Sequence, residues 1–483
     1  MPAVPFLGFT PDAPSDTPGV ITALSNVIPT EKGLAGAPSG IAPSGVGALA
    51  APCVGAAVVV STDGSRRTYA GTTTRLYELV AGTWTDRSRV ALYTGTSDTR
   101  WIFTQFGNAT IATNDGAVLQ ASVGGAFSDI ATAPQAKVVV SVANFVLAFN
   151  TVDGTFGDQS DRWWCSAFQD HTSWTPSVTT QATTGRLVGE GGEITAACRL
   201  GQNVVVYKGR AMWLGQYVGP PAVWQFDQVP GEVGCVGSEA VVDVGGANVF
   251  VGEDNIWLYD GTRPVPIATG QVRQWFFNNS SALYRYKTLC TFDRQNNRVY
   301  FWYVSRNSTT GVLDSCLVYH MQTKQWGSAD QTIQTAINYV GAGATYDTTS
   351  GTYDAAPNVP YDSQYWLSGG RAPAVFNSSN QVLTLTGAST CGALVTGDVG
   401  DDDYESFVRR VRLRFLQEPA SATITGQIKD GLGGTLLAGD SGVLADAKFD
   451  LRQAARWHRF SFTFTGDFEL TSMNVDAVAG GKR

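Results

Sequence analysis

The chain has few charged residues, few methionines and few histidines, and each shortage narrows what it can be. Of its 483 residues only 15% are charged and 4 are methionine, so the mixture that builds long helices is scarce. The three histidines, His171, His320 and His458, stand far apart and match no zinc-ligand spacing. We therefore expect little helix, no bound metal and no cofactor.

Cysteine pairs and long apolar runs are also missing. Seven cysteines are spread along the chain without a CxxC pair, which favours buried thiols and synthesis in a reducing compartment. No stretch approaches the roughly 18 apolar residues of a membrane span. The first ten residues, Met1–Thr10, lack the basic and apolar regions of a signal peptide. We expect neither a membrane span nor export by the standard signal.

Three short motifs resemble catalytic or blade-marking sequences, and each lacks an essential part. Gly439–Gly442 is similar to the nucleophile loop of trypsin-like serine proteases, and Thr195–Cys198 is similar to their histidine-bearing segment but holds no histidine. Ser61–Tyr69 is one residue short of the sialidase Asp-box and occurs once. We interpret all three as turns and predict that the chain is not an enzyme.

Glycine and aromatic residues are plentiful, and they occur in a repeated sequence pattern. The chain contains 54 glycines and 11% aromatics. Six times it places a short strand rich in β-branched or aromatic residues before a polar turn, usually followed by an aromatic residue. A repeat of roughly 40–50 residues with several strands per unit is typical of a β-propeller blade. The copies are Leu76–Trp84, Val118–Phe127, Cys165–Trp174, Met212–Trp224, Ile256–Pro264 and Cys316–Trp326.

The composition changes along the chain and predicts an all-β protein of four parts. Residues 1–50 are rich in Pro and Gly and predict an extended N-terminal arm with apolar residues to bury. Residues 51–335 predict a β-propeller of six blades. Residues 336–402 predict either a seventh blade or an insertion, with strands at Tyr365–Ser368 and Gln381–Thr386. Residues 403–483 alternate in hydrophobicity and predict an antiparallel β-sandwich.

Charge is unevenly placed between these parts. Residues 403–483 hold 11 Lys and Arg against 10 Asp and Glu, so the rest of the chain, with 22 against 31, carries all the excess negative charge. Six arginines of the C-terminal part form a candidate partner contact, and the alternative is a solvated strand face. They are Arg410, Arg412, Arg414, Arg452, Arg456 and Arg459.

Both ends of the chain resemble one protein family. Gly19–Ser39 contains Asn26, Pro29 and Gly33 in the spacing Asn-x-x-Pro-x-x-x-Gly, as in tail proteins of short-tailed bacteriophages. Trp457–Val478 is similar to the terminal strands of the same family. The chain thus resembles the tail nozzle proteins, also described as tail tubular protein B or packaged-DNA stabilisation proteins.

The resemblance implies a structural protein of the virion tail, made in the host cytoplasm. Such a protein forms a ring-shaped nozzle below the portal–adaptor complex, closes the DNA exit channel after packaging and conducts DNA during ejection. The implied partners are further copies in a hexamer, the adaptor or head–tail connector, tail fibres or spikes, and double-stranded DNA that passes through the channel without sequence-specific binding.

Two further expectations follow. The arm and the C-terminal part are expected to make the ring and adaptor contacts, so deleting residues 1–40 is expected to leave a folded propeller that no longer assembles on the connector. The alternative function is a carbohydrate-binding or glycan-degrading β-propeller that serves as a receptor-binding tail component.

Overall fold

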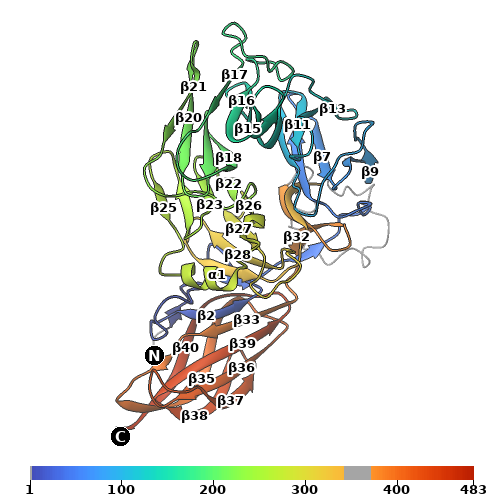
Figure 1. The fold of residues 1–483 in the computed structure, drawn as a ribbon. Helices are drawn as coiled ribbons and strands as arrows, with labels where there is room; N and C mark the ends of the chain where they lie inside the picture. The colour runs from blue at the N-terminus through green and yellow to red at the C-terminus, as the bar shows by residue number, and fades with distance from the viewer. Residues whose placement is uncertain (1–2, 342–370, 483) are drawn as a thin grey trace.

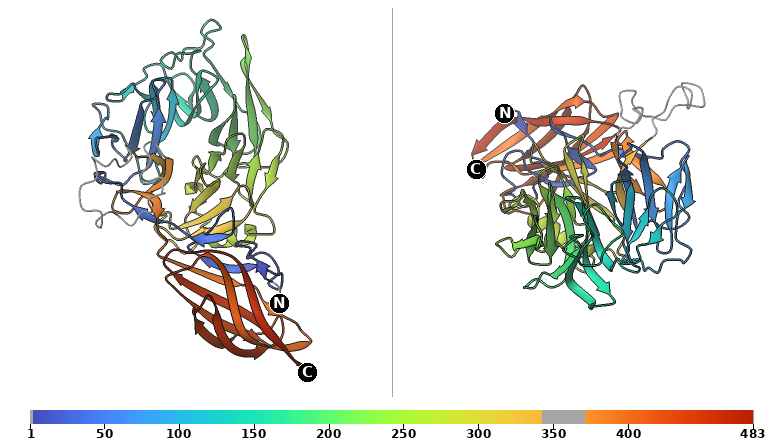
Figure 2. Two further views of the ribbon diagram at one scale, coloured as in Figure 1. Left: turned by 180° about the vertical axis from the view of Figure 1, so that it is seen from behind. Right: turned by 90° about the horizontal axis from the view of Figure 1, so that it is seen from above.

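The computed structural model describes residues 3–341 and 371–482, and they form two connected β-bodies. The larger body surrounds a hub, and the smaller body lies on one side of it (Figures 1 and 2). Helix is confined in the described residues to α1 (Arg273–Asn279) and the 3-10 turn η1 (Arg285–Lys287). No described helix has the length and apolar character that crossing a bilayer requires. The predicted all-β fold is confirmed.

The larger body is a propeller of seven four-stranded antiparallel blades. The first strands of successive blades, β6, β10, β14, β18, β22, β26 and β30, contact one another in that order, and β30 contacts β6, which closes the ring. Blades one to three consist of β6 (Gly55–Val60), β7 (Arg66–Gly71), β8 (Leu76–Val80) and β9 (Thr83–Asp86); β10 (Ile102–Phe106), β11 (Ala109–Thr113), β12 (Gln120–Ser122) and β13 (Ser128–Asp129); and β14 (Gln135–Val142), β15 (Phe145–Asp153), β16 (Gly157–Cys165) and β17 (Thr183–Arg186).

Blades four to six follow the same plan. Each is built from four strands that are consecutive in sequence, and α1 and η1 lie between blades five and six. The strands are β18 (Ile194–Leu200), β19 (Asn203–Lys208), β20 (Met212–Gly219) and β21 (Val223–Gln228); β22 (Val241–Asp243), β23 (Asn248–Val251), β24 (Ile256–Tyr259) and β25 (Pro264–Pro266); and β26 (Leu289–Asp293), β27 (Arg298–Tyr303), β28 (Ser315–His320) and β29 (Trp326–Ala329).

Most copies of the repeated sequence pattern fall on the outer half of a blade, whereas Cys165–Trp174 begins at the last residue of β16 and otherwise lies in the loop that follows. Leu76–Trp84 covers β8 and the start of β9, and Cys316–Trp326 covers β28 and the turn into β29. Several aromatic residues of the pattern are buried because flat rings cover the space beside neighbouring strands, whereas Phe168 and Tyr217 are both 40% exposed. Trp174 and Trp326 are only 1% and 0% exposed.

The seventh blade joins strands from distant parts of the sequence. It consists of β30 (Thr335–Val340), β31 (Arg371–Phe376), β32 (Val382–Gly387) and β5 (Ser39–Ile41) from the N-terminal segment. β32 falls on the strand predicted at Gln381–Thr386, whereas the strand predicted at Tyr365–Ser368 lies outside the described residues. Residues 391–400 enter the sheets of the smaller body, so the structure divides the described part of this segment between the two bodies.

The smaller body is a sandwich of two antiparallel sheets. Phenylalanines from one sheet fill the space between them, with Phe460, Phe462 and Phe464 all 0% exposed. One sheet contains β40 (Glu469–Lys482), β35 (Tyr404–Gln417) and β38 (Phe449–Ala455), with β1 (Val4–Pro5) on β40; the other contains β2 (Ile21–Ser25), β33 (Cys391–Thr396), β39 (Trp457–Thr465), β36 (Ser421–Lys429) and β37 (Leu437–Val443), with β34 (Val399–Gly400) on β39.

The N-terminal segment connects the two bodies. The hairpin of β3 (Val27–Pro29) and β4 (Leu34–Gly36) pairs with β29 of blade six on one side and with β40 of the sandwich on the other. A single sheet therefore runs from the propeller into the sandwich. In Figure 1 the blue strand β2 lies between the two bodies, and both chain ends lie at the sandwich.

Side chains reinforce this connection, which we call the joint (residues 3–41 and the strands they pair with). Phe9 is fully buried, its ring lies 4.8 Å from that of Trp275, and its N–H donates to the Trp326 carbonyl. Asp12 accepts hydrogen bonds from the first amides of α1. The predicted arm thus packs against its own chain and supplies β5 to blade seven, so we now expect its deletion to disturb the propeller.

Candidate functional site

The arginines of β35 lie on the outer face of the sandwich. Arg412 and Arg414 are exposed and alternate with the buried Val411 and Leu413, as a half-buried strand requires. Arg410 is half-buried and forms an ion pair with Asp450 of β38, with 2.7 Å between Nε and Oδ1. The neighbouring carboxylate reduces the positive charge at this end of the stripe.

The other three predicted arginines differ in where they lie relative to the arginines of β35. Arg452 is exposed on β38, and its backbone N–H donates to Asp440. Arg456 follows β38 and donates to the carbonyl of Asp430. Arg459 lies in the opposite sheet and is bound to a buried carboxylate. The structure therefore brings Arg410, Arg412, Arg414 and Arg452 onto one sheet and separates Arg459 from them.

That buried carboxylate belongs to Asp398, whose side chain is fully enclosed. Arg459 contacts both of its oxygens at 2.9 Å, Lys429 donates to Oδ2 at 2.8 Å, and Ser15 of the N-terminal segment donates to Oδ2 at 2.7 Å. Burial opposes ionisation, but the bonds from Arg459, Lys429 and Ser15 outweigh it and lower the pKa of Asp398. The network fastens the N-terminal segment to the sandwich.

The pair most like a catalytic one, Ser406 and His458, lies within the sandwich. Ser406 Oγ is 3.0 Å from His458 Nε2, and Gln453 Nε2 is 3.0 Å from His458 Nδ1. The N–H of Asp440 binds Gln453 Oε1, so the Gln453 amide nitrogen faces the histidine. An amide nitrogen only donates, so Nδ1 accepts and Nε2 carries the hydrogen. His458 therefore donates to Ser406 and does not accept its proton.

The remaining histidines and the residues of the short catalytic-like motifs lie in turns, strands or ring contacts of the fold. His320 Nδ1 accepts the N–H of Thr323, and the ring of His171 packs near that of Phe106. Asp63, in the Asp-box-like segment, accepts the N–H of Ser65 in the turn between β6 and β7. Ser441 lies on β37 opposite Thr425. Among residues 3–341 and 371–482, no three His, Cys, Asp or Glu side chains gather into a potential metal site.

One end of the propeller hub is crossed by an ion pair that sequence reasoning missed. Arg100 precedes blade two and Glu239 precedes blade five, and their side chains meet with 3.2 Å between Nε and Oε2. Arg100 also donates to the carbonyl of Gln334, before blade seven. Burial raises the pKa of Glu239, against the attraction of Arg100. These residues link three blades that are not consecutive, and no local motif marks them.

The hub contains a cavity with both polar and apolar lining residues. A cavity of about 270 Å³ is bordered by residues of β6, β22, β26 and β30. Small side chains such as Ala56, Ala57 and Ala336 line it, with Phe292 and Arg371 at other points. The cavity thus lies between the first strands of blades one, five, six and seven.

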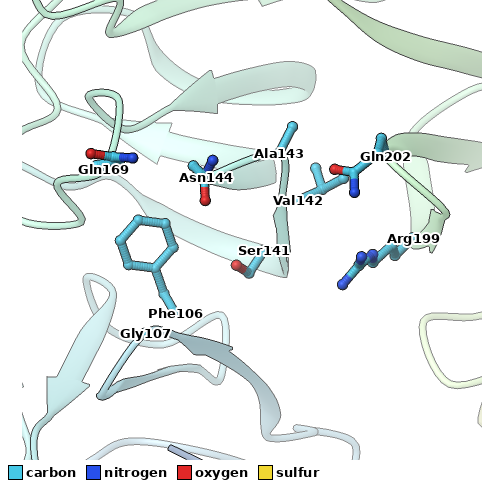
Figure 3. A pocket seen from close by; sticks show the side chains of 9 residues that line it. All are labelled: Phe106, Gly107, Ser141, Val142, Ala143, Asn144, Gln169, Arg199 and Gln202. Carbon is cyan, nitrogen blue, oxygen red and sulfur yellow. The ribbon is translucent and has the colours of Figure 1, made fainter. Parts of the chain in front are cut away.

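A larger hollow, of about 510 Å³, lies among the hairpin turns of blades two, three and four (Figure 3). Gln169 and Phe106 lie on one side in that view, Arg199 and Gln202 on the other, and Asn144 between them. Ser141, Val142, Ala143 and Gly107 complete the lining. The sequence offered no signal for this site because its residues come from three hairpin turns and the separate loop that holds Gln169.

Comparison with known proteins gives no family for this chain. No protein-family model matches it, and no curated protein matches it. Similar solved structures include the designed protein Ika8 (12% identity, 70% of this chain and 97% of that chain, TM-score 0.34) and YCF48 bound to D1 peptide (13%, 60% and 84%, 0.33). A chain of the mitotic checkpoint complex aligns at 8% identity over 72% and 93%, with TM-score 0.39. Likenesses this low carry no argument about function.

The partners predicted from the sequence are corrected. The N-terminal segment expected to contact ring and adaptor neighbours pairs with strands of its own chain instead. The hexamer, the adaptor, the fibres or spikes and the DNA are therefore withdrawn as partners.

Proposed function

We propose that the chain is a non-catalytic structural protein of the tail of a short-tailed phage, of the nozzle type that its ends resemble. The observation that carries this proposal is the meeting of those two ends in the joint. Gly19–Ser39 supplies β2, β3 and β4, and Trp457–Val478 supplies β39 and most of β40. Leu34 of β4 pairs with Leu470 of β40. The two segments that resemble the tail proteins thus form one continuous part of the structure.

The proposed role is mechanical and located in the virion tail. A sheet that continues from blade six into the sandwich resists movement between the two bodies, because bending would break backbone hydrogen bonds at the joint. The buried Asp398 network adds a second attachment. Rigid coupling of two bodies suits a component that transmits load.

The absence of catalysis is part of the proposal and is supported by the Ser406–His458 pair. A serine nucleophile needs a base that accepts its proton. Here the orientation of Gln453 makes His458 a donor toward Ser406. The pair is explained as a structural hydrogen-bond network.

Antibodies raised against the purified chain test the location. Particles are purified from cells that carry the gene, and bound antibody is located by immunogold electron microscopy. Label on short tails is the expected result, with preimmune serum as the control. Particles with tails but without this chain, detected by mass spectrometry, would overturn the proposal.

An assay for sugar release separates the glycan-degrading alternative. The purified chain is incubated with bacterial polysaccharides, and new reducing ends are measured. We expect no release above a heat-denatured control, and sustained release would replace a structural role with an enzymatic one.

A further inference from the structure

The walls of the hollow in Figure 3 are preformed by backbone geometry. Ala143 and Asn144 both have positive φ, at 48° and 64°, as a two-residue hairpin turn of type I′ requires. The N–H of Gln169 donates to the Asn144 carbonyl at 2.9 Å, which fixes the neighbouring loop to this turn. The N–H of Ser141 donates to Thr104 of β10, which connects blades two and three. A ligand would therefore meet a shaped surface without first ordering a loop.

The side chains on these walls include one aromatic ring, three amides and one guanidinium. Asn144, Gln169 and Gln202 are exposed, and no described residue bonds to their side-chain amides. Phe106 is half-buried at the end of β10. No carboxylate lines the hollow. The lining is thus rich in hydrogen-bonding groups and has no negative charge of its own.

Arg199 supplies the positive charge. Its Nε donates to the carbonyl of Gly201 at 2.6 Å, which holds the side chain beside the turn between β18 and β19. It forms no ion pair with a described residue, and its remaining N–H groups face the hollow in Figure 3. A guanidinium presents paired donors that match the oxygens of a carboxylate or a phosphate.

We propose that this hollow binds an anionic pyranose, a six-membered sugar ring that carries a carboxylate or a phosphate. The sugar's C–H groups would pack against the Phe106 ring, and its hydroxyls would exchange hydrogen bonds with Asn144, Gln169 and Gln202, whose amides both donate and accept. The anionic group would bind Arg199. A volume of about 510 Å³ lies within the roughly 300–1,000 Å³ of small-molecule sites. The inference is independent of the proposed tail function.

Binding to the full chain is measured by saturation-transfer NMR and calorimetry with four probes. D-glucuronate and glucose 6-phosphate carry the anion on a sugar, D-glucose is the neutral sugar, and acetate is an anion without a sugar. We expect glucuronate or glucose 6-phosphate to bind at least roughly tenfold more tightly than glucose and acetate. Whichever of these two sugars binds more tightly identifies whether the preferred anion is a carboxylate or a phosphate. Equal binding of acetate, or no binding of either anionic sugar, would overturn the proposal.

Two variants locate the binding. Arg199→Gln is expected to remove the preference for anionic sugars over glucose, and Phe106→Leu to weaken all sugars while acetate is unaffected. Arg263→Gln changes an exposed arginine in blade five and serves as the matched control. Circular dichroism confirms that each variant is folded. Unchanged binding by folded Arg199→Gln would place the ligand elsewhere and reject this site.

Discussion

The propeller and the joint are stabilised by different kinds of contact. In blades one to six, the four strands of each blade follow one another in sequence, and apolar clusters lie between neighbouring blades. In the joint, strands from the two ends of the chain share sheets, and a buried carboxylate holds two cations and a serine. The comparison teaches that local repeats build the larger body, whereas contacts between chain ends determine its attachment to the smaller one.

Removing residues 1–41 is expected to have the largest effect on the joint and on the stability of the protein. The deletion takes away β1 to β5, and with them the fourth strand of blade seven and the hairpin at the joint. We expect loss of cooperative unfolding, since the exposed edges and apolar surface outweigh a typical stability of about 5–15 kcal/mol. Calorimetry and near-UV circular dichroism measure this.

A deletion of residues 1–5 is the control, because it removes only the short pairing of β1 with β40. It should unfold cooperatively at a slightly lower temperature. A chain lacking residues 1–41 with the melting behaviour of the full chain would show that the joint is dispensable.

Asp398→Asn tests the charged part of the joint. The variant leaves Lys429 and Arg459 close together without their buried counter-ion. We expect a loss of about 3–5 kcal/mol in the free energy of unfolding, measured by urea denaturation. Asp450→Asn, which removes the exposed partner of Arg410, should change stability very little. Equal effects of the two variants would contradict the assigned importance of burial.

Lowering the pH weakens the same network in the native sequence. The pKa of Asp398 lies below its ordinary value of 3.8, so ionised Asp398 contributes its stability in full above about pH 4. That contribution is lost as the pH falls through the lower pKa of the folded state. The difference in unfolding free energy between the native chain and Asp398→Asn should therefore shrink in acid. A constant difference from neutral pH to pH 2 would refute the assignment.

Glu239→Gln tests the ion pair of the hub and should have a smaller effect. Burial raises the pKa of Glu239 although Arg100 is present, so the charged form is less favoured here than at Asp398. A glutamine keeps the shape and a hydrogen-bond acceptor for Arg100. We expect a change of about 1 kcal/mol or less in the free energy of unfolding. A loss as large as that of Asp398→Asn would mean that the hub depends on charge as strongly as the joint does.

Thiol reactivity distinguishes the two bodies without altering them. The six propeller cysteines lie at 53, 165, 198, 235, 290 and 316, and five of them are buried, whereas Cys391 of the sandwich is exposed. Burial raises the pKa of Cys53, Cys198 and Cys235 to about 12, so their reactive thiolates are scarce. Ellman's reagent should modify one thiol rapidly in the native chain and all seven in denaturant. Rapid native reaction of a second thiol, identified by mass spectrometry, would indicate opening of a blade.

The sequence was informative where strands are neighbours in the chain. Aromatic and β-branched residues at short spacing predicted the blade hairpins, and the alternation around Val411 and Leu413 predicted β35. The seventh blade was left open between two interpretations because its fourth strand, Ser39–Ile41, lies far upstream. The arm was predicted to bury apolar residues, but its contacts were assigned to other molecules. Nothing local in Ser15 indicates that it binds Asp398.

The sequence by itself determined an all-β protein with repeated blades and an alternating C-terminal sheet, because hairpins form between adjacent segments whose pattern is visible residue by residue. Only the tertiary structure decided that seven blades close through β5, that residues 3–41 join the bodies, and that Phe106, Asn144 and Arg199 share one hollow. Those features depend on which distant segments of the chain come into contact. Apolar packing and buried charges stabilise those contacts only when the whole chain has folded.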